Sequence, residues 1–225
     1  MNILVVSDFH NDVESLMKYI DKVALLDFDV ITVVGDFTDY NVQRGFSAVD
    51  IGRLIIEELS SLNKPILATP GNFDKELLPF FEEEDILLHG NGKIIKNVGF
   101  YGFGGAKTPF NTPFEPSETE VENGLLKGYE EVKNCKTKVQ VTHIPPRNTK
   151  LDIVFTGAHV GSEVVRKFIE KYQPNVAVCA HIHEARGTDE IGETKIINSG
   201  RFPEGYCGLV TVEKDRTETK IINLI

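Results

Sequence analysis

Acidic residues and histidines of metal-ligand type stand at short spacings at five points of the chain. One residue separates Asp8 from His10, and one separates His181 from His183. In an extended segment, residues i and i+2 project to the same side, so each pair can direct two ligands toward one ion. The three points between them are GDFTD (Asp36, Asp39), GNFD (Asn72, Asp74) and THIPP (His143). Carboxylate, amide oxygen and imidazole are ligands for divalent first-row metals, and the set contains no thiolate.

Each of these five points follows a short apolar run that has the character of a β-strand. The runs are 3 to 6, 30 to 34, 66 to 68, 139 to 142 and 176 to 180. In open α/β sheets the carboxyl ends of the strands border the ligand crevice, so we expect the five polar endings to converge. A single such piece is usually a turn with a surface histidine. The five points together contain four of the six histidines of the chain, which favours a metal site.

The segments between these strands predict helices outside two mixed sheets. We expect a first helix after a cap at Asn11, with Glu14 three residues later, and a second between 45 and 61. A third is expected from a capping box at Ser117 to about Val132, and a fourth from Ser162 to Tyr172. Hairpins are expected at 94 to 103, 186 to 198 and 208 to 222. No boundary divides the chain, so we expect a single domain over residues 1–225.

The ordered set DxH, GDxxD, GNxD, an isolated His and HxH resembles that of the calcineurin-like metallophosphoesterase family. The similarity extends from Asp8 to His183, most of the chain. It implies an α/β fold, a four-layer α/β/β/α sandwich of two mixed sheets flanked by helices. It also implies two divalent metal ions, with Mn as the first expectation and Fe, Zn or Ni as alternatives. By this resemblance one ion is held by Asp8, His10, Asp36 and His183, and the other by Asp36, Asn72, His143 and His181, so that Asp36 bridges them.

The same resemblance implies a phosphoesterase that hydrolyses a phosphodiester or phosphomonoester by attack of a metal-bridging hydroxide. Two ions can lower the pKa of a shared water and stabilise the charge that develops on the phosphate oxygens. The alternative is a non-catalytic protein-interaction scaffold, since the fold also serves that role in a retromer subunit. A scaffold predicts eroded ligands, whereas here suitable residues fill all seven positions. A purely structural metal site would instead require closed coordination shells.

Two positions depart from the family pattern. Many members have His after the Asn, where it can protonate the leaving oxygen, but this chain has Phe73. The departure favours diesters or substrates with good leaving groups. Ala180 replaces the usual Gly of GHxH, a change that a strand end tolerates. A compensating candidate for the catalytic general acid is His159, just before the helix at Ser162; the alternative is a histidine without a role.

Other polar residues near the motifs have expected supporting roles. Asp39 and Asp74 are expected to orient neighbouring ligands and loops. Arg186 and Arg201 are candidates to clamp phosphate, although surface arginines are common. His89, which follows the acidic run EEED, is expected to be solvated.

Residues 103 to 116, FGGAKTPFNTPFEP, fit neither the helical nor the strand period. Two interpretations stay open for this Gly-, Pro- and Phe-rich loop: a surface connection, or a lid with exposed aromatic side chains over a site.

Composition limits the partners. The chain has 34 acidic and 24 basic residues and a formal net charge of -10, which makes duplex nucleic acid an unexpected partner. Three dispersed cysteines indicate neither a disulfide framework nor a thiolate zinc site. No apolar run reaches the ~20 residues of a membrane span, and no signal peptide is recognisable, so a cytoplasmic location is expected. The expected partner is a small phosphoester, and an oligomer remains open.

Overall fold

The first of two mixed sheets carries the first three polar endings. The computed structural model describes residues 1–213 and 216–225. The strands of the first sheet are, in spatial order, β11 (Thr217–Asn223), β10 (Tyr206–Val212), β1 (Asn2–Val6), β2 (Val30–Val34) and β3 (Ile66–Thr69). Strands β1, β2 and β3 are parallel, and β10 runs antiparallel to β1. The end of the chain therefore pairs with its beginning.

The second sheet carries the other two endings. Its spatial order is β4 (Asn91–Ile95), β5 (Val98–Phe103), β6 (Thr137–Thr142), β7 (Val176–Cys179), β9 (Thr194–Asn198) and β8 (Gly187–Ile191). The four inner strands are parallel, while β4 and β8 close the two edges as antiparallel hairpin partners. The three predicted hairpins are thus present, each within a few residues of its expected bounds.

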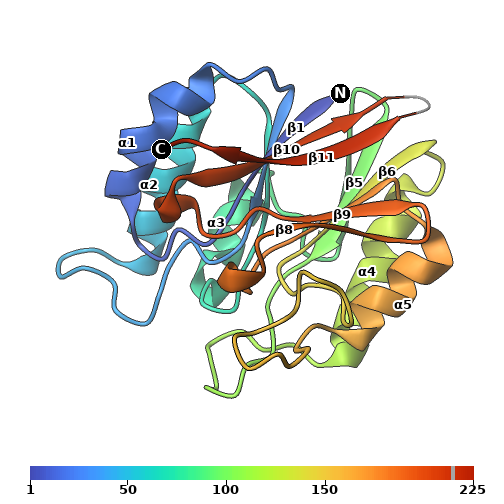
Figure 1. Cartoon of the computed structure of the whole chain (residues 1–225). Helices are drawn as coiled ribbons and strands as arrows, with labels where there is room; N and C mark the ends of the chain where they lie inside the picture. The colour runs from blue at the N-terminus through green and yellow to red at the C-terminus, as the bar shows by residue number, and fades with distance from the viewer. Residues whose placement is uncertain (214–215) are drawn as a thin grey trace.

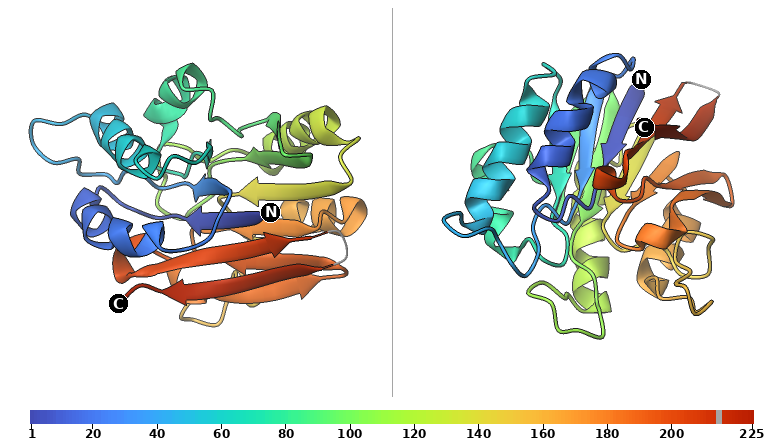
Figure 2. Two further views of the ribbon diagram at one scale, coloured as in Figure 1. Left: turned by 90° about the horizontal axis from the view of Figure 1, so that it is seen from above. Right: turned by 60° about the vertical axis from the view of Figure 1, so that its left-hand side comes forward.

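Helices cover the outer face of each sheet. The first sheet packs against α1 (Val13–Ala24), α2 (Ala48–Ser60) and α3 (Leu78–Glu83), and the second packs against α4 (Glu118–Val132) and α5 (Glu163–Tyr172). A third apolar cluster fills the space between the two sheets. Figures 1 and 2 show the resulting layers, with α1 and α2 on one side and α4 and α5 on the other. The expected four-layer arrangement is confirmed.

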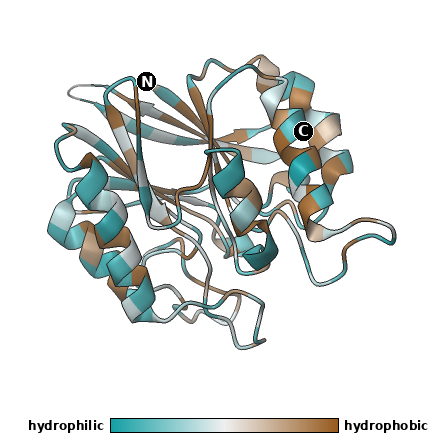
Figure 3. Ribbon diagram, turned by 180° about the vertical axis from the view of Figure 1, so that it is seen from behind, coloured by the Kyte–Doolittle hydropathy of each residue, from teal (hydrophilic) through white to brown (hydrophobic). Residues whose placement is uncertain are grey.

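The helices begin where short polar side chains can satisfy free backbone N–H groups. Ser117 and Glu120 form the predicted capping box of α4, and Ser162 caps α5. The cap of α1 is Asp12, whose side chain accepts from the backbone N–H of Ser15, so the expected cap at Asn11 is wrong by one residue. Figure 3 shows hydrophobic and hydrophilic residues alternating on the helices, as one-sided burial requires.

The short helix α3 was not predicted, because its six residues are too few to show a period. Within the described ranges, no helix has the length and apolar character needed to cross a bilayer. That residues 1–225 form a single domain stays a prediction, as does the cytoplasmic location. The oligomeric state stays open.

The two sheets bring five strand ends to one edge of the sandwich, and two glycines allow their loops to meet. Gly35 has φ +83°, and a Cβ there would lie 2.4 Å from Nδ1 of His143. A Cβ on Gly71 would lie 2.1 Å from Oδ1 of Asp36. Only glycine permits this approach, so the loops after β2, β3 and β6 interlock at the site.

Candidate metal centre and its cavity

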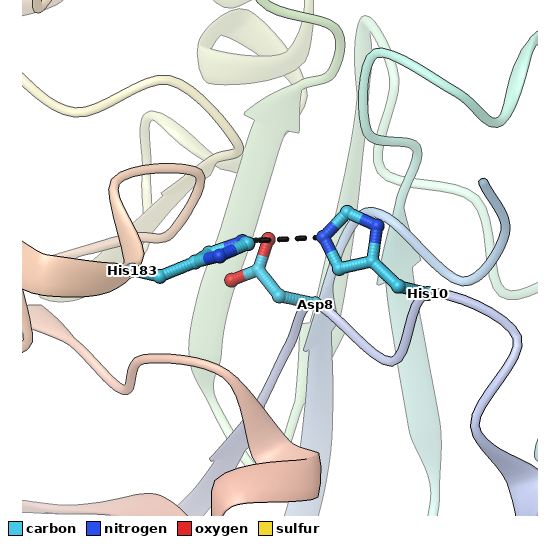
Figure 4. A group of neighbouring side chains, drawn as sticks. All are labelled: Asp8, His10 and His183. Atoms are coloured by element: carbon cyan, nitrogen blue, oxygen red, sulfur yellow. Dashed lines mark hydrogen bonds and ion pairs between the residues drawn. The ribbon is translucent and has the colours of Figure 1, made fainter. Parts of the chain in front are cut away.

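The first group of potential ligands comprises Asp8, His10 and His183, each offering one ligand atom within 4.8 Å of the others. Asp8 and His10 follow β1, while His183 begins a short turn after β7, so the group joins the two sheets. Nε2 of His183 lies 3.4 Å from Oδ1 of Asp8 and 3.2 Å from Nε2 of His10. Figure 4 shows the three side chains converging from these two segments.

The second group comprises Asp36, His143 and His181. Nε2 of His143 lies 3.3 Å from Oδ2 of Asp36 and 3.1 Å from Oδ1 of Asn72. The His143 and His181 rings lie 5.0 Å apart, centroid to centroid. Asn72 therefore belongs to the same cluster, although only its amide oxygen takes part.

Asp36 connects the two groups. Its Oδ2 lies 3.3 Å from Nε2 of His143 in one group and 3.8 Å from Nε2 of His10 in the other. All seven residues that the sequence singled out as ligands are thus brought to one place. The one carboxylate expected to bridge is also the one that contacts both groups.

The burial of Asp8 provides a test of whether cations fit this cluster. Its side chain is fully buried, and neither carboxylate oxygen has a hydrogen-bond partner among the described residues. The 3.4 Å contact with His183 lacks hydrogen-bond geometry. Burial alone would raise the pKa of Asp8. The neighbouring His183 and His143 act in the opposite direction and together outweigh burial, so the pKa is lowered and the carboxyl is ionised at neutral pH. A buried anion without a hydrogen-bond donor is costly unless cations neutralise it, so the residues fit divalent metals.

The backbone supports this interpretation. Four of the clustered residues adopt left-handed φ angles, namely Asp8 (56°), His10 (48°), Asp36 (50°) and His181 (70°). Side-chain-bearing residues reach this region at a cost on the order of 1 kcal/mol each. Such strain concentrates at functional sites, where it directs side chains that an ordinary strand would turn away.

Neighbouring groups fix the orientation of the ligands. Nδ1 of His143 lies 2.7 Å from the carbonyl oxygen of Val34, to which it can donate, leaving Nε2 as the lone-pair nitrogen that faces the cluster. Oδ2 of Asp39 lies 3.5 Å from Nδ1 of His10. That nitrogen has no hydrogen-bond partner among the described residues, so an orienting role of Asp39 stays a prediction.

Asp74 links the loop after β3 to the loop after β2. Its carboxylate accepts from the backbone N–H groups of Gly71, Phe37 and Thr38, at 2.7, 3.2 and 3.1 Å, and from the Thr38 hydroxyl at 3.0 Å. Burial, together with the charge of Asp36, raises the pKa of Asp74 to about 6. Asp74 therefore holds the loops that carry Asp36 and Asn72.

The buried charges also set the protonation of the imidazoles. Burial, with His143 as a neighbour, lowers the pKa of His181 to about 4, so this ring is neutral at pH 7 and its lone pair can bind a metal. Burial acts against charge on both Asp36 and His143. Their mutual attraction nevertheless lowers the pKa of Asp36 well below its usual range and raises that of His143 to about 9. A cation at this point would take over the role of the proton on His143.

A cavity of about 590 Å³ opens over the cluster. Its floor includes His10, Asp36, Asn72, His181 and His183. The walls are formed by Tyr40, Phe73, Lys107, Thr108, Pro109, Phe110, Thr112, Val154, Thr156, Val160 and Ile182. Five of these belong to the loop 103 to 116, which favours the lid interpretation over a plain surface connection.

His159, predicted as the general acid, does not line this cavity, although its neighbour Val160 does. Its Nδ1 lies 2.7 Å from Oδ1 of Asp152, a fully buried carboxylate that also accepts from the backbone N–H groups of Thr149 and Gly161. The pair holds the loop 144 to 161 in shape. Catalysis by His159 stays a prediction that this geometry does not favour.

The two arginines also lie outside the cavity walls. The Arg186 guanidinium lies 3.5 Å from the centroid of the Tyr206 ring and 3.1 Å from Oε2 of Glu204, so packing and an ion pair already occupy it. Arg201 is half-buried and close enough to His183 to lower its pKa, although the net shift of His183 is upward. A phosphate clamp by either arginine stays a prediction.

The expectation that His89 is solvated is wrong. Its ring stacks on Phe103, with centroids 3.9 Å apart, and its Nδ1 accepts from the backbone N–H of Gly104 at 3.1 Å. Phe114 covers another side at 5.3 Å. The acidic run before it suggested solvent, but the chain turns inward at Ile86 and carries His89 beneath the loop 103 to 116.

We predict that divalent cations stabilise the protein through the buried cluster. A metal at 100 times its Kd adds about 2.7 kcal/mol, so saturating Mn²⁺ should raise Tm by about 5 to 10 °C. Asp8→Asn should lose most of this shift, while its metal-free Tm equals or exceeds that of the wild type because an unpaired buried charge is gone. Asp21→Asn, the same change on an exposed part of α1, is the control. A Tm insensitive to Mn²⁺, Zn²⁺, Ni²⁺ and Fe²⁺ would contradict the assignment.

We predict that His89 makes the protein less stable in acid. Burial, with Lys127 adding to it and Glu120 opposing it, lowers the pKa of His89 to about 4, below its usual 6.5. The unfolded chain then binds more protons between these values, so stability falls as pH decreases from 6.5 toward 4. Urea unfolding with chelator at pH 7.5 and 4.5 should show a smaller loss for His89→Gln than for wild type, by up to about 2 kcal/mol. Equal losses would mean that His89 is protonated in the folded state.

Comparisons with known proteins agree with the geometry. The chain matches the family model of the calcineurin-like phosphoesterases over residues 1–185. It is 36% identical over 214 residues to the uncharacterized protein MJ1162 of Methanocaldococcus jannaschii, a match that covers 92% of this chain and 90% of that protein.

Two solved structures share the fold. TT1561 of Thermus thermophilus superposes with a TM-score of 0.74 at 19% identity, covering 100% of this chain and 99% of that one. A dimetal phosphatase from Danio rerio superposes with a TM-score of 0.67 at 10% identity, covering 100% and 96%. Because the family model matches most of its length, the chain belongs to the calcineurin-like phosphoesterase family.

Proposed function

We propose that this protein is a phosphoesterase that uses two divalent metal ions to hydrolyse a small phosphodiester or phosphomonoester. One ion would be held by Asp8, His10, Asp36 and His183, and the other by Asp36, Asn72, His143 and His181. Mn²⁺ is our first choice because the ligands are carboxylates, imidazoles and one amide, and Fe, Zn or Ni suit the same set.

The observation that carries this proposal is the shared carboxylate. Asp36 reaches imidazole nitrogens of both groups, at 3.3 and 3.8 Å, so two cations bound there would be neighbours that share one ligand. Such a pair, when bound, supplies an activated water at neutral pH and positive charge for the phosphate oxygens. A single structural metal would need only one of the two groups.

The remaining residues of the chain bind and position. The interlocked loops hold Asp36 and Asn72 in place through Asp74, and the carbonyl of Val34 holds His143. The cavity opens directly over these residues, so a phosphate can reach them from solvent while its organic group stays against the walls. Pre-positioned ligands of this kind avoid the cost of reorganising the site during the reaction.

Phe73 limits protonation of the leaving group. Its ring packs edge-on against His10, with centroids 5.8 Å apart, and it lines the cavity next to Asn72. A phenyl ring donates no proton, and His159 lies outside the cavity walls. The site is therefore suited to phosphoesters whose leaving oxygen departs without strong acid assistance, which favours diesters with good leaving groups.

The alternative of a non-catalytic scaffold is less well supported. A scaffold requires no ionised carboxylate with both oxygens buried and unpartnered, as seen for Asp8. It also requires no cavity over the ligands. Metal analysis that found well under one ion per chain would restore this alternative.

We predict metal-dependent hydrolysis of bis(4-nitrophenyl) phosphate or 4-nitrophenyl phosphate. Asp36→Asn removes the shared charge and should lower kcat by more than about 100-fold, as should His181→Ala. Asp21→Asn should match the wild type. Metal content per chain, measured by mass spectrometry, should fall in the same two variants. Hydrolysis that survives both changes would eliminate the model.

We predict that the rate depends steeply on the leaving group because Phe73 provides no proton. In a series of aryl phosphodiesters, kcat/KM should fall as the pKa of the released phenol rises. Phe73→His should flatten this dependence, with a gain of about 10-fold or more for the poorest leaving group. Phe73→Leu, which removes the phenyl ring and adds no acid, is the control. A dependence that is already flat in the wild type would show that another group donates the proton.

A further inference from the structure

The walls of the cavity differ in character from its floor. The floor is polar and carries the metal-ligand cluster, whereas the walls are largely aromatic and aliphatic: Tyr40, Phe73, Pro109, Phe110, Val154 and Val160. Several of them are unusually exposed for large apolar side chains, with Tyr40 57%, Phe110 74% and Val160 40% accessible. Exposed apolar side chains gathered at one place mark a surface that another molecule covers.

Two aromatic rings, Tyr40 and Phe73, pack together in these walls, and the backbone of Phe110 adjoins them. Tyr40 and Phe73 meet edge to face, with centroids 4.7 Å apart and an interplanar angle of 80°. The Tyr40 hydroxyl reaches the carbonyl oxygen of Phe110 at 3.4 Å, which connects the loop after β2 with the loop 103 to 116. All three aromatic residues line the cavity, where a flat aromatic group can pack against them.

The loop that supplies Phe110 is held in shape. Oε1 of Glu115 accepts from the Thr108 hydroxyl at 2.6 Å and from the backbone N–H and hydroxyl of Thr112 at 2.6 and 2.7 Å. The Thr108 hydroxyl oxygen accepts in turn from the backbone N–H of Phe110 at 3.1 Å. Burial acts to raise the pKa of Glu115, but these donors lower it to about 2, so the carboxylate stays charged. The aromatic part of the walls is therefore built before a ligand arrives.

The charge of the walls restricts the ligand further. Among the described residues, Lys107 is the one lysine or arginine that lines the cavity. A ligand with several phosphates would leave its outer charges without partners there. The volume of about 590 Å³ accommodates a phosphate on the floor together with one or two rings, which is the range of small-ligand sites.

Building on the proposed function, we propose that the phosphoester cleaved by this protein carries a flat aromatic group, which binds against Tyr40, Phe73 and Phe110 while its phosphate lies on the metal-ligand floor. Tyr40 and Phe110 are specificity-determining residues and take no part in bond breaking. Esters of small aliphatic alcohols or of polyols lack the surface that these rings would cover and bind more weakly.

The test compares ligands that share a phosphate-like head and differ in the group that meets the walls. Isothermal titration calorimetry of the Mn²⁺-loaded protein with phenylphosphonate and methylphosphonate measures binding without turnover. The wild type should bind phenylphosphonate about 10-fold more tightly, and Tyr40→Ala or Phe110→Ala should each remove most of that preference without changing the affinity for methylphosphonate. In parallel, kcat/KM should favour phenyl 4-nitrophenyl phosphate over methyl 4-nitrophenyl phosphate, which release the same phenol.

Two control variants separate stacking from other effects. Tyr40→Phe keeps the ring and loses the hydroxyl, so it should keep the preference for the phenyl ligand. Phe155→Ala removes an aromatic side chain that is 92% exposed and lies outside the cavity walls, so it should behave as wild type. Tyr40 and Phe110 are themselves exposed, so their alanine variants should fold with nearly unchanged Tm.

The outcomes distinguish this inference from the proposed function. Equal affinity for the two phosphonates, or equal weakening of both in the alanine variants, overturns the aromatic site and leaves the phosphoesterase standing. If neither phosphonate binds and neither ester is hydrolysed with any of the four metals, the proposed function fails and the inference fails with it. The assignment is also overturned if Phe155→Ala removes the preference for phenylphosphonate as strongly as Phe110→Ala does.

Discussion

Two ionised carboxylates, Asp8 and Asp36, are buried where the two sheets meet, and the rest of the site is arranged around them. Both are at least 98% inaccessible to solvent, so water cannot screen their charge. Burying an anion costs several kcal/mol, more than a single surface ion pair returns, and Asp36 offsets part of this cost through His143 whereas Asp8 has no hydrogen-bond donor among the described residues. The chain surrounds the pair with imidazoles and an amide oxygen, which are neutral donors in their metal-binding form. This composition leaves net negative charge at the centre, which is the electrostatic condition for divalent cations.

The same burial explains why the sandwich must be rigid at this edge. Left-handed backbone at Asp8, His10, Asp36 and His181 is unfavourable locally, so it persists only where surrounding packing imposes it. Three apolar clusters supply that packing: one between the sheets and one under each helix layer. Interior packing of this density resists relaxation, so the strain stays at the strand ends instead of dissipating through the sheets.

The candidate ligand residues could be located from the sequence because each follows a buried apolar strand, and the resemblance to the family implied their grouping. Strand periodicity did not predict their directions: the backbone is left-handed at Asp8, His10 and His181, and His181 and His183, expected to aim together, lie in different groups. Asp8 and His183 each follow a buried strand, and parallel strands end at a common edge. The walls could not be predicted in the same way. Tyr40 and Val160 lie on loops whose paths depend on contacts between distant segments, such as the bond from the Tyr40 hydroxyl to Phe110. The prediction that His89 is solvated was wrong for the same reason, because the acidic residues next to it in sequence do not determine how the chain folds back over it.

This difference between floor and walls follows from what each must do. Ligands of a metal pair tolerate displacements of only a few tenths of an ångström, so they belong on the ends of strands held by two sheets. Groups that select a substrate can tolerate more variation, and loops change without disturbing the layers beneath them. In this chain the loop 103 to 116 is tied by Glu115, and the loop 144 to 161 by Asp152, each through a single carboxylate that accepts several hydrogen bonds. Substitutions within these loops can therefore change the walls while Asp8 and Asp36 keep their surroundings, which separates specificity from the chemistry of the centre.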